Sequence, residues 1–410
     1  MKASNPGEIS IVGGGIAGLA LALNLHKRAI PCRVYEAAPM IHEIGVGITI
    51  LPHAMRELAA LGLKDELVAA GIENRHSSYF NRFGQMIYTE PRGTGAGYPY
   101  PEIGIHRGRL HGALYKAVLQ RLGPDSVVTG RQCIGLEQDE VGVSLHFRDV
   151  PDTVRSEIAI ACDGVNSAIR AHFNPGEAMV FSGINSWRGI TRRSPILDGR
   201  TYMRIGSVQT GKMTLYPIAD DVDGEGRQLI NWIAQLPATA HEKNDWNKTA
   251  RPADFIERFS SWRFDWLDVP ELIETADSIF EYPMVDRDPI NLWTSGRVTL
   301  AGDAAHPMYP RGSNGSAQAL IDVRILADFL QEYTDPVEAM HAYEALRRPE
   351  TTRVVQTNRT SPPDMINTRV QELTGDRPFI DLDTFITQPE LRQLSEQYEH
   401  AAKFALKDVR

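Results

Sequence analysis

A glycine-rich turn near the N-terminus limits the fold more than any other feature of this sequence. Residues 13–18 read Gly-Gly-Gly-Ile-Ala-Gly, and they follow a short apolar segment at 8–12. An apolar-periodic segment, 16–28, comes next, and Pro31 separates it from a β-branched segment at 32–35. A strand, a helix and a strand in this order form a βαβ unit, whose two strands must be parallel. We therefore expect an open α/β sheet.

The positions of the glycines predict what this turn binds. Gly13 permits a tight turn, Gly15 lets a phosphate approach the backbone, and Gly18 lets the helix and the strand pack closely. The N-terminus of the helix attracts a pyrophosphate, and Glu36, at the end of the second strand, can accept hydrogen bonds from ribose hydroxyls. The pattern predicts a dinucleotide site without separating flavin from nicotinamide. The alternative is a glycine-rich turn followed by a chance acidic residue.

Composition narrows the class of protein. The 410 residues carry a formal net charge of −9 without a basic block, so we expect neither nucleic acid nor a membrane surface as a partner. No apolar run reaches the roughly eighteen residues of a transmembrane helix. The three cysteines, Cys32, Cys133 and Cys162, are widely separated. That spacing favours a reducing, cytoplasmic location over a disulfide framework or a zinc site.

The order of sequence patterns predicts more than one domain. A chain of this length exceeds the size of a single core, and long β-rich segments begin near residue 178, with short helices expected at 253–262 and 269–275. We expect an α/β fold with three parts. They are a three-layer Rossmann-type domain (1–75, 101–177 and 276–355), a second, mixed β-sheet domain (76–100 and 178–275) and a C-terminal helical segment (356–410).

Two later motifs bear on the cofactor. Asp163-Gly164 follows a strand and precedes a helix that Asn166 or Ser167 can cap, with Arg170 one turn inside it. Taken alone, this motif is equally well a capped turn. Gly302-Asp303 ends a buried strand, and it places a carboxylate where ligands bind in open α/β sheets.

The segment after Gly302-Asp303 adds a helix N-terminus. Residues 310–315 read Pro-Arg-Gly-Ser-Asn-Gly and lead into a helix predicted to end near Gln331. Bare backbone N–H groups at Gly312 and Gly315 can face the pyrimidine edge of a flavin. The helix dipole would favour the negative charge of a reduced flavin by about 0.3–2 kcal/mol.

These three motifs, in this order, resemble the single-component (group A) flavoprotein aromatic hydroxylases of the para-hydroxybenzoate hydroxylase type. Within that family the chain is most similar to the branch that contains 5-methylphenazine-1-carboxylate monooxygenase. The similarity extends to about Asn358. The segments that carry the closer similarity are Gly45-Val46-Gly47-Ile48, Ile105-His106-Arg107-Gly108, Trp187-Arg188-Gly189, the run 282–289 and Tyr309-Pro310-x-Gly312-x-Asn314-Gly315.

The resemblance implies bound FAD and transient use of NADH or NADPH, because no second glycine fingerprint is present. It also implies which residues hold the flavin. Val46 and Gly47 are expected beside its ring, with the glycine allowing close approach, and Asp163 and Arg170 are expected to serve both phosphate geometry and NAD(P)H use. The expected cofactor residues are Gly13, Gly15, Ile16, Ala17, Gly18, Glu36, Val46, Gly47, Arg107, Asp163, Asp303, Gly312, Asn314 and Gly315.

The resemblance further implies hydroxylation of a small aromatic or heteroaromatic substrate with O2, through a flavin C4a-hydroperoxide that must be kept dry. Carboxylated and phenazine-like compounds are among the candidate substrates. The candidate catalytic residues are Pro307, Tyr216 and Arg188. A strand alternates its faces, so Trp187 and Arg188 cannot both point inward.

Several alternatives stay open at this point. Tyr216 and Arg188 are equally well ordinary core or surface residues, and Arg311 either pairs with a substrate carboxylate or lies in solvent. His306 is more often structural. An FAD-dependent dehydrogenase or a flavin-binding protein without hydroxylase activity would carry the same motifs. A flavin-dependent halogenase is disfavoured, because no Trp-x-Trp-x-Ile-Pro element occurs. The sequence does not decide between NADH and NADPH, or between a monomer and a homodimer.

Overall fold

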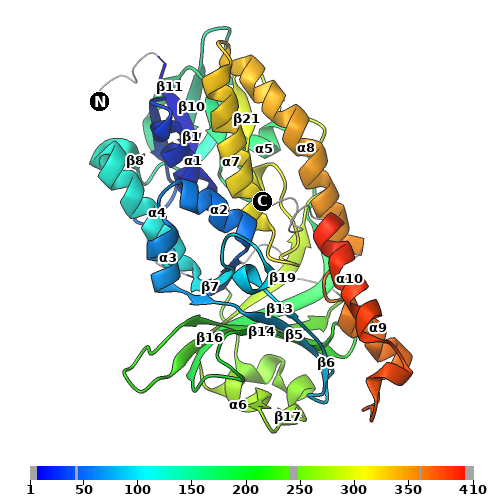
Figure 1. The fold of residues 1–410 in the computed structure, drawn as a ribbon. Helices are drawn as coiled ribbons and strands as arrows, with labels where there is room; N and C mark the ends of the chain where they lie inside the picture. Colours follow the sequence, from blue (N-terminus) through cyan, green and yellow to red (C-terminus); the bar gives the residue numbers. More distant parts are fainter. Residues whose placement is uncertain (1–6, 42–44, 240–247, 361, 402–410) are drawn as a thin grey trace.

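The computed structural model describes residues 7–41, 45–239, 248–360 and 362–401. Two large sheets dominate it, one above the other in Figure 1. The upper sheet is flanked by long helices, and the lower sheet has short helices beneath it. This arrangement confirms the predicted α/β fold, with its Rossmann-type sheet, its second sheet and its C-terminal helices. The ends of the predicted first and last parts, 1–6 and 402–410, lie outside the described residues.

The upper sheet has six strands in the order β20-β21-β12-β1-β2-β8. All neighbours from β21 to β8 pair in parallel, and β20 is antiparallel. The central strands are fully buried, which suits a parallel sheet covered on both faces. The strands are β1 (Ile9–Val12), β2 (Cys32–Tyr35), β8 (Val127–Val128), β12 (Ala159–Ala161), β20 (Thr294–Ser295) and β21 (Val298–Leu300).

Helices of the upper sheet come from distant parts of the sequence. Helix α1 packs against α4 and α7, and α7 packs against α2 and α8. The predicted helix at 16–28 and the predicted helix end near Gln331 agree with the structure within one or two residues. The helices are α1 (Ile16–Lys27), α2 (Pro52–Ala60), α3 (Lys64–Ala70), α4 (Arg107–Leu122), α5 (Ala168–Phe173), α7 (Gly315–Glu332) and α8 (Pro336–Thr360), with the short turns η2 (Pro124–Ser126) and η5 (Gly302–Ala304).

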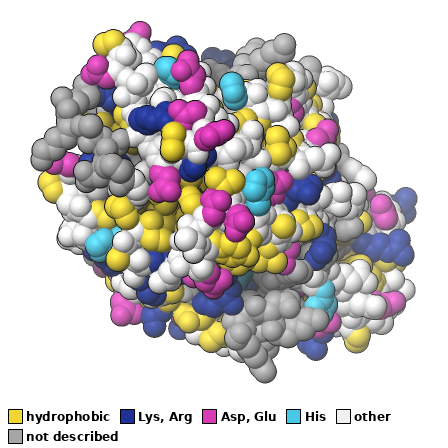
Figure 2. Space-filling view, turned by 90° about the horizontal axis from the view of Figure 1, so that it is seen from above, with side chains coloured by type: hydrophobic (Ala, Val, Ile, Leu, Met, Phe, Trp, Pro, Cys, Tyr) yellow, Lys and Arg dark blue, Asp and Glu magenta, His cyan; other side chains and the backbone are white. Residues whose placement is uncertain are grey.

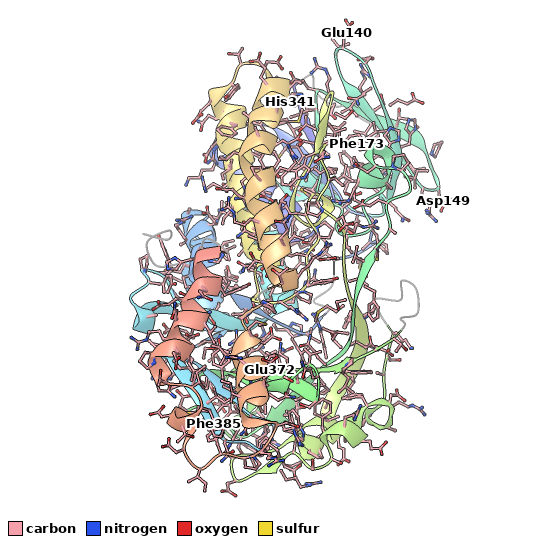
Figure 3. All side chains as sticks on the ribbon, turned by 90° about the vertical axis from the view of Figure 1, so that its right-hand side faces the viewer. Glu140, Asp149, Phe173, His341, Glu372 and Phe385 are labelled. Carbon is pink, nitrogen blue, oxygen red and sulfur yellow. The ribbon has the colours of Figure 1, made fainter. Side chains whose placement is uncertain are left out.

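Two three-stranded sheets complete the upper part. One has the order β11-β10-β9, and the other has the order β3-β7-β4. In Figure 3, Glu140 and Asp149 mark turns at the two ends of β10. The strands are β3 (Gly47–Ile50), β4 (Ile72–Glu73), β7 (Ile103–His106), β9 (Cys133–Gln138), β10 (Val143–Phe147) and β11 (Val150–Ser156).

The lower sheet has seven strands in the order β19-β13-β16-β15-β14-β5-β6. Strand β19 pairs with β13, so residues 276–286 belong to this sheet and not, as predicted, to the Rossmann-type part. The strands are β5 (His76–Phe80), β6 (Met86–Pro91), β13 (Val180–Arg193), β14 (Thr201–Ser207), β15 (Gly211–Ala219), β16 (Gln228–Pro237) and β19 (Ala276–Asp286), and η1 (Gly93–Ala96) follows β6.

One face of the lower sheet is covered by short elements. An apolar core under this face includes Trp232, Phe255 and Trp262. The helix predicted at 253–262 is wrong, because Phe255 interrupts the helical path and leaves two short 3₁₀ turns. The covering elements are η3 (Pro252–Asp254), η4 (Ile256–Phe259), β17 (Arg263–Phe264), β18 (Leu267–Asp268) and α6 (Val269–Glu274).

The C-terminal helices lie along one side of the molecule and reach both sheets (Figure 1). Helix α9 packs on β14 and β5 of the lower sheet, and α10 packs on α8 and α9. Glu372 and Phe385 mark this region in Figure 3, at the end of the molecule opposite Glu140. The elements are α9 (Met365–Thr374), η6 (Leu382–Thr384) and α10 (Gln388–Ala401).

On the face in Figure 2, Lys and Arg side chains are interspersed with Asp and Glu, and hydrophobic side chains fill part of the area between them. Among the described residues, no helix is both long and apolar enough to cross a membrane.

Candidate active site

The glycine turn between β1 and α1 has the shape that its sequence predicts. Gly13 has a φ of +101°, and a Cβ built on it would lie 2.4 Å from the carbonyl oxygen of Cys162. A Cβ on Gly18 would lie 1.9 Å from the carbonyl oxygen of Gly13. A Cβ on Gly15 would meet nothing within 4 Å. The outer two glycines are therefore required by packing, while Gly15 faces open space where a phosphate can approach.

Glu36 joins the end of β2 to this turn. Its carboxylate accepts a hydrogen bond from the backbone N–H of Gly14 at 2.6 Å and another from Ala38 at 2.8 Å. The imidazole of His111, on α4, lies 2.6 Å from the carbonyl oxygen of Gly14 through Nε2. Glu36 thus stands where the sequence predicts, beside the helix N-terminus, with its carboxylate orienting two backbone segments.

The Asp163-Gly164 turn is fixed by capping. Ser167 accepts a hydrogen bond from the backbone N–H of Arg170, and Asp163 Oδ2 accepts one from Ala168. Asp163 Oδ1 is buried without a hydrogen-bond partner among the described residues, and burial raises the pKa of this carboxyl. One oxygen of Asp163 holds the turn, and the other has no hydrogen-bond partner among the described residues.

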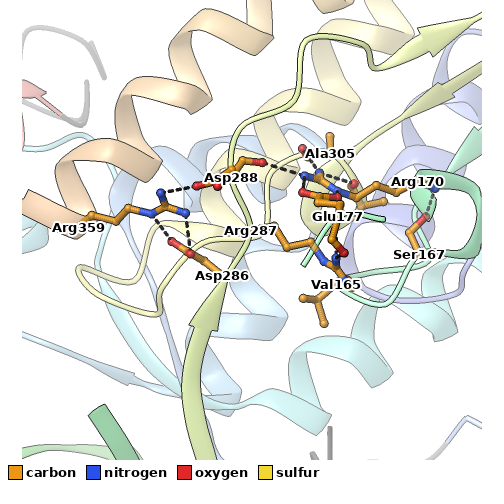
Figure 4. Close-up of polar contacts among 10 residues, drawn as sticks. Val165, Ser167, Arg170, Glu177, Asp286, Arg287, Asp288, Ala305 and Arg359 are labelled. Atoms are coloured by element: carbon orange, nitrogen blue, oxygen red, sulfur yellow. Dashed lines mark hydrogen bonds and ion pairs between the residues drawn. The ribbon is translucent and has the colours of Figure 1, made fainter. Parts of the chain in front are cut away.

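Arg170 connects this turn to the Gly302-Asp303 turn (Figure 4). Its guanidinium is 1 % exposed, forms an ion pair with Glu177 and donates to the carbonyl oxygens of Ala304 and Ala305 at 3.1 and 2.6 Å. These contacts occupy the side chain, so they do not support the expected direct role of Arg170 toward phosphate or NAD(P)H. Its role in this structure is to hold two loops together.

The Gly302-Asp303 turn lies directly against the first turn. A Cβ on Gly302 would lie 3.1 Å from Cβ of Ala17 on α1. Asp303 is exposed at the turn, although desolvation by the surrounding protein raises its pKa while the neighbouring His306 and Arg107 oppose that rise. A Cβ on Gly315 would lie 3.9 Å from Oδ1 of Asp303. The structure therefore brings together Ala17, Asp303 and the start of α7.

A buried charged group supports this turn from behind. Asp322, on α7, contacts Nε2 of His306 and accepts a hydrogen bond from Arg347 at 2.7 Å. The same carboxylate accepts one from the backbone N–H of Gly302 at 3.2 Å. Despite burial, the neighbouring charges of His306 and Arg347 lower the pKa of Asp322. His306 is therefore structural, as its sequence context favours.

On strand β13, the adjacent residues Trp187 and Arg188 point to opposite faces, and their contacts show which of the two points inward. Trp187 stacks on Phe255 at a ring-centroid distance of 4.7 Å, within the core under the lower sheet. Arg188 lies on the opposite face, with its guanidinium 5.1 Å from the ring centroid of Tyr282. Arg188 therefore faces the upper part of the molecule.

Tyrosine side chains share the inward face with Arg188. Tyr216 is buried and stacks on Tyr202 at a centroid distance of 5.0 Å. Both belong to an apolar cluster with Val46 and Ile190. Burial raises the pKa of Tyr216, while the nearby charge of Arg188 opposes that rise. The Tyr216 hydroxyl is consequently a proton donor in hydrogen bonds at neutral pH.

The segment 45–47 connects the two parts of the molecule. A Cβ on Gly47 would lie 2.6 Å from Cβ of Asn231 on β16, and the backbone N–H of Gly47 donates to Asn231 Oδ1 at 2.7 Å. The absence of a side chain at Gly47 therefore permits close approach of the lower sheet. Arg107, exposed at the start of α4, donates its backbone N–H to the carbonyl oxygen of Val46.

In the loop before α7, Gly312 packs against a residue of α10. A Cβ on Gly312 would lie 1.8 Å from the hydroxyl of Tyr398 on α10. The absence of a side chain at Gly312 therefore accommodates Tyr398. Asn314 is fully buried and donates to the same hydroxyl at 2.9 Å. Arg311 is half-buried rather than fully in solvent, and it donates to the carbonyl oxygen of Asn358 at 3.4 Å.

These loops fit a bound FAD on three observations. Gly15 offers open space at a helix N-terminus, Asp163 presents an unpartnered oxygen, and Asp303 presents a carboxylate beside the start of α7. Pyrophosphate suits the first feature, and hydroxyl groups suit the other two. Pro307 is buried just after the Asp303 turn.

A cavity of about 450 Å³ lies elsewhere, between α3 and α4, and is lined by residues that include Ile41, Leu67, His111 and Tyr115. It shares His111 with the environment of the glycine turn and contains none of the predicted catalytic residues. We therefore place the candidate site at the converging loops and not at this cavity.

Sequence reasoning missed four residues of the site. Tyr202, Asn231 and Arg204 lie on the inward face of the lower sheet; Arg204 lies between the rings of Tyr79 and Tyr202. Alternation along β14 and β16 would reveal their faces once the inward face of one neighbouring strand is known. Tyr398 is far from every motif, and no sequence signal marks it.

Comparison with known proteins agrees with this geometry. A family model described as an FAD binding domain matches residues 7–358. The chain is 41 % identical over 369 residues to the phenazine 1,6-dicarboxylic acid hydroxylase of Lysobacter antibioticus, covering 88 % of this chain and 91 % of that protein. It is 33 % identical to a 3-amino-4-hydroxybenzoate 2-monooxygenase of Streptomyces platensis, covering 87 % and 88 %.

A solved structure shows the same fold. The HpxO protein of Klebsiella pneumoniae, complexed with FAD and uric acid, superposes with a TM-score of 0.78 at 22 % sequence identity, covering 98 % of this chain and 96 % of that one. The family model, the relatives and the fold confirm the resemblance drawn from the three motifs and favour the hydroxylase over the alternative of a flavoprotein without hydroxylase activity. The chain belongs to the FAD-binding family of group A flavoprotein aromatic hydroxylases, monooxygenases that use FAD, NAD(P)H and O2.

Proposed function

We propose that this enzyme hydroxylates a carboxylated aromatic or heteroaromatic ring, phenazine-like compounds included, and that Arg188 binds the carboxylate. The observation that carries the proposal is the state of Arg188. This side chain faces inward, and its Nε is buried without a hydrogen-bond partner among the described residues. Besides burial, the groups that most affect the pKa of Arg188 are Tyr216, Tyr282, Tyr202 and Arg107, and none of these four is a carboxylate.

An arginine in this state favours an anionic ligand. Burial lowers the pKa of Arg188, yet a guanidinium stays charged at neutral pH. Arg188 is half-buried, with its Nε withdrawn from water. A carboxylate that binds both guanidinium edges would offset this loss of solvation. The named substrates of the two relatives, a phenazine dicarboxylic acid and an aminohydroxybenzoate, both carry carboxylates.

We assign the cofactor contacts from the converging loops. Gly15, Ile16 and Ala17 at the start of α1 would hold the pyrophosphate, together with Gly13 and Gly18, which shape the turn. Glu36, Arg107, Asp163 and Asp303 would bind the polar groups of FAD, and Gly312, Asn314 and Gly315 would present the N-terminus of α7 to the ring. Val46 and Gly47 would lie at its edge. When bound, FAD accepts hydride from NAD(P)H and activates O2 for transfer of one oxygen atom to the substrate.

The remaining residues would orient the substrate and exclude water. The buried Tyr216 hydroxyl would donate a hydrogen bond to a ring substituent, because its raised pKa keeps it protonated. Val46, Ile190 and Ile218 form an apolar wall beside it, and Pro307 would add a rigid wall near the Asp303 turn. Without such walls water would reach the reacting centre, and reducing equivalents would be lost as H2O2.

We place this reaction in the cytoplasm, where NAD(P)H is available, with the chain acting as a monomer or a homodimer. Support for the location comes from Cys32, Cys133 and Cys162, which are all free thiols. Structural disulfides are rare in a reducing compartment.

The test compares carboxylated compounds with their amides or methyl esters. Benzoates, salicylates, hydroxynicotinates and phenazine carboxylates are scored for accelerated NAD(P)H oxidation and for one added oxygen atom by mass. Arg188→Met should raise KM for the carboxylated substrate at least tenfold, which corresponds to about 1.4 kcal/mol, and leave the amide unaffected. The control is Arg192→Met, an exposed arginine on the same strand. Equal KM values for acid and amide in the parent enzyme would contradict the assignment of Arg188.

A further inference from the structure

The C-terminal helix α10 lies outside the segment that the family model matches, yet it contacts the loop 311–314 before α7. That match ends at residue 358, whereas α10 covers Gln388–Ala401. Tyr398 on this helix is 5 % exposed. Its hydroxyl lies among groups of the segment 311–314, which leads into α7, and of Asn358.

The Tyr398 hydroxyl makes several polar contacts. It accepts a hydrogen bond from Nδ2 of Asn314 at 2.9 Å. It donates to Oδ1 of Asn358 at 3.0 Å or to the carbonyl oxygen of Arg311 at 3.3 Å. Asn358 in turn donates to the carbonyl oxygen of Tyr309 at 3.3 Å. One hydroxyl therefore connects both sides of the loop.

The loop has a backbone shape that needs such support. Gly312 and Ser313 have φ values of +70° and +57°, so two consecutive residues are left-handed. A left-handed serine costs roughly 1–2 kcal/mol. A Cβ on Gly312 would also lie 1.8 Å from the Tyr398 hydroxyl. The loop is consequently shaped around the ring of Tyr398, and its contacts offset the backbone cost.

Helix α10 holds Tyr398 in place through the lower sheet. Leu391 is fully buried in a cluster with Ile87 and Tyr88 of β6. Glu399, the next residue after Tyr398, forms an ion pair with Arg92 at 3.3 Å, just after β6. Contacts with the lower sheet therefore fix the position of the Tyr398 hydroxyl, which itself contacts the loop 311–314.

We propose that Tyr398 is a positioning residue of the flavin site: its hydroxyl fixes the loop 311–314 so that the N-terminal N–H groups of α7 face the flavin. This inference rests on the cofactor contacts assigned above to Gly312, Asn314 and Gly315. It extends the site beyond the family-matched segment, to a helix that also contacts the lower sheet.

The experiment removes the hydroxyl and keeps the ring. Tyr398→Phe and the parent are prepared as full chains, and FAD binding to each apoprotein is titrated by the change in flavin fluorescence. The visible spectrum of bound FAD and the thermal unfolding midpoint of each apoprotein are also recorded. We expect FAD to bind about tenfold more weakly to Tyr398→Phe, a difference of about 1.4 kcal/mol, with altered flavin absorbance and an apoprotein midpoint close to that of the parent.

A matched substitution controls for the loss of any tyrosine hydroxyl. Tyr333 lies just after α7, with 39 % of its surface exposed, and Tyr333→Phe should leave the FAD dissociation constant within twofold of the parent. A double-mutant cycle with Gly312→Ala adds a second test. Both residues act on one loop, so the two changes should be clearly non-additive in FAD affinity.

Two outcomes would overturn the proposal. One is an unchanged FAD dissociation constant and spectrum in Tyr398→Phe. The other is a fall in the apoprotein unfolding midpoint with no change in the spectrum of the flavin that still binds, which would identify a role in folding alone. Neither outcome depends on hydroxylation, so a parent enzyme that binds FAD but hydroxylates no carboxylated compound would refute the proposed substrate class and leave this test intact.

Discussion

The guanidinium of Arg170 donates a hydrogen bond to the carbonyl oxygen of Ala305, 2.6 Å away. The two residues follow different strands of the parallel sheet, β12 and β21, which are neighbours. Arg170 also forms an ion pair with Glu177 and donates to the carbonyl oxygen of Asp288 at 3.0 Å (Figure 4). A single side chain thus ties together the two turns that carry Asp163 and Asp303.

Replacing Arg170 should therefore weaken both folding and flavin retention. Arg170→Met leaves the Glu177 carboxylate without this partner and two buried carbonyls without donors, and removal of one member of a buried pair costs about 3–5 kcal/mol. We expect a clearly lower thermal unfolding midpoint and a lower FAD content after purification. In Arg155→Met, where the lost pair with Asp139 is exposed, the change should stay within about 1 kcal/mol. Similar midpoints for the two variants would contradict this role.

Asp303 should determine flavin affinity without determining stability. Its pKa is raised by desolvation, so the folded protein keeps this carboxylate at the turn at a cost that a bound hydroxyl group can offset. Asp303→Ala should weaken FAD binding by roughly tenfold to a hundredfold, from about 1–3 kcal/mol for a lost hydrogen bond to a charged group. Asp277→Ala, at an exposed position of β19, serves as the control in the same titration. Full flavin occupancy in Asp303→Ala would refute the assignment.

The sequence predicts the upper part of this molecule well because local chemistry dictates it. A Cβ on Gly18 would meet the carbonyl oxygen of Gly13, and Ser167 caps its helix, so much of these turns follows from residues close together in the chain. The strand–helix–strand order and the three motifs were sufficient to predict the sheet and the family. The sheet in the structure agrees with the one that these motifs predict.

Contacts between distant segments could not be predicted in this way. The close packing at Gly47 is explained by Asn231, and that at Gly312 by Tyr398, both of which lie far along the chain. Arg188 points inward because Trp187, the preceding residue, stacks on Phe255 at the opposite face of β13. The sequence restricts Arg188 and Trp187 to opposite faces, but only the tertiary packing decides which face is inward.

Tyr216 is predicted to affect coupling more than cofactor binding. Tyr216→Phe keeps the stacking on Tyr202 and removes one hydrogen-bond donor from this apolar cluster. We expect the hydroxylated product formed per NAD(P)H consumed to fall severalfold, because a lost hydrogen bond of about 0.5–1.5 kcal/mol loosens the substrate. Flavin content should be unchanged. Product yields equal to those of the parent enzyme across good substrates would exclude Tyr216 from the substrate site.

The docking of α10 should respond to pH through Glu399. Burial, with Glu90, Glu102 and Glu396 nearby, raises the pKa of Glu399 to about 7, although the charge of Arg92 opposes that rise. An acid whose folded pKa is raised binds its proton more tightly in the folded state than in the unfolded state. This group therefore destabilises the fold progressively as pH rises from about 4.5, its ordinary value, to about 7.

Glu399→Gln should remove that dependence. We expect its thermal unfolding midpoint to exceed that of the parent by roughly 1–3 °C at pH 8 and to approach the parent value near pH 5, where the parent carboxyl is protonated. Glu396→Gln, at an exposed position of the same helix, controls for the loss of one negative charge. A difference between Glu399→Gln and the parent that stays constant from pH 5 to pH 8 would show that the carboxyl titrates alike in the folded and unfolded chains, contrary to its buried position beside Arg92.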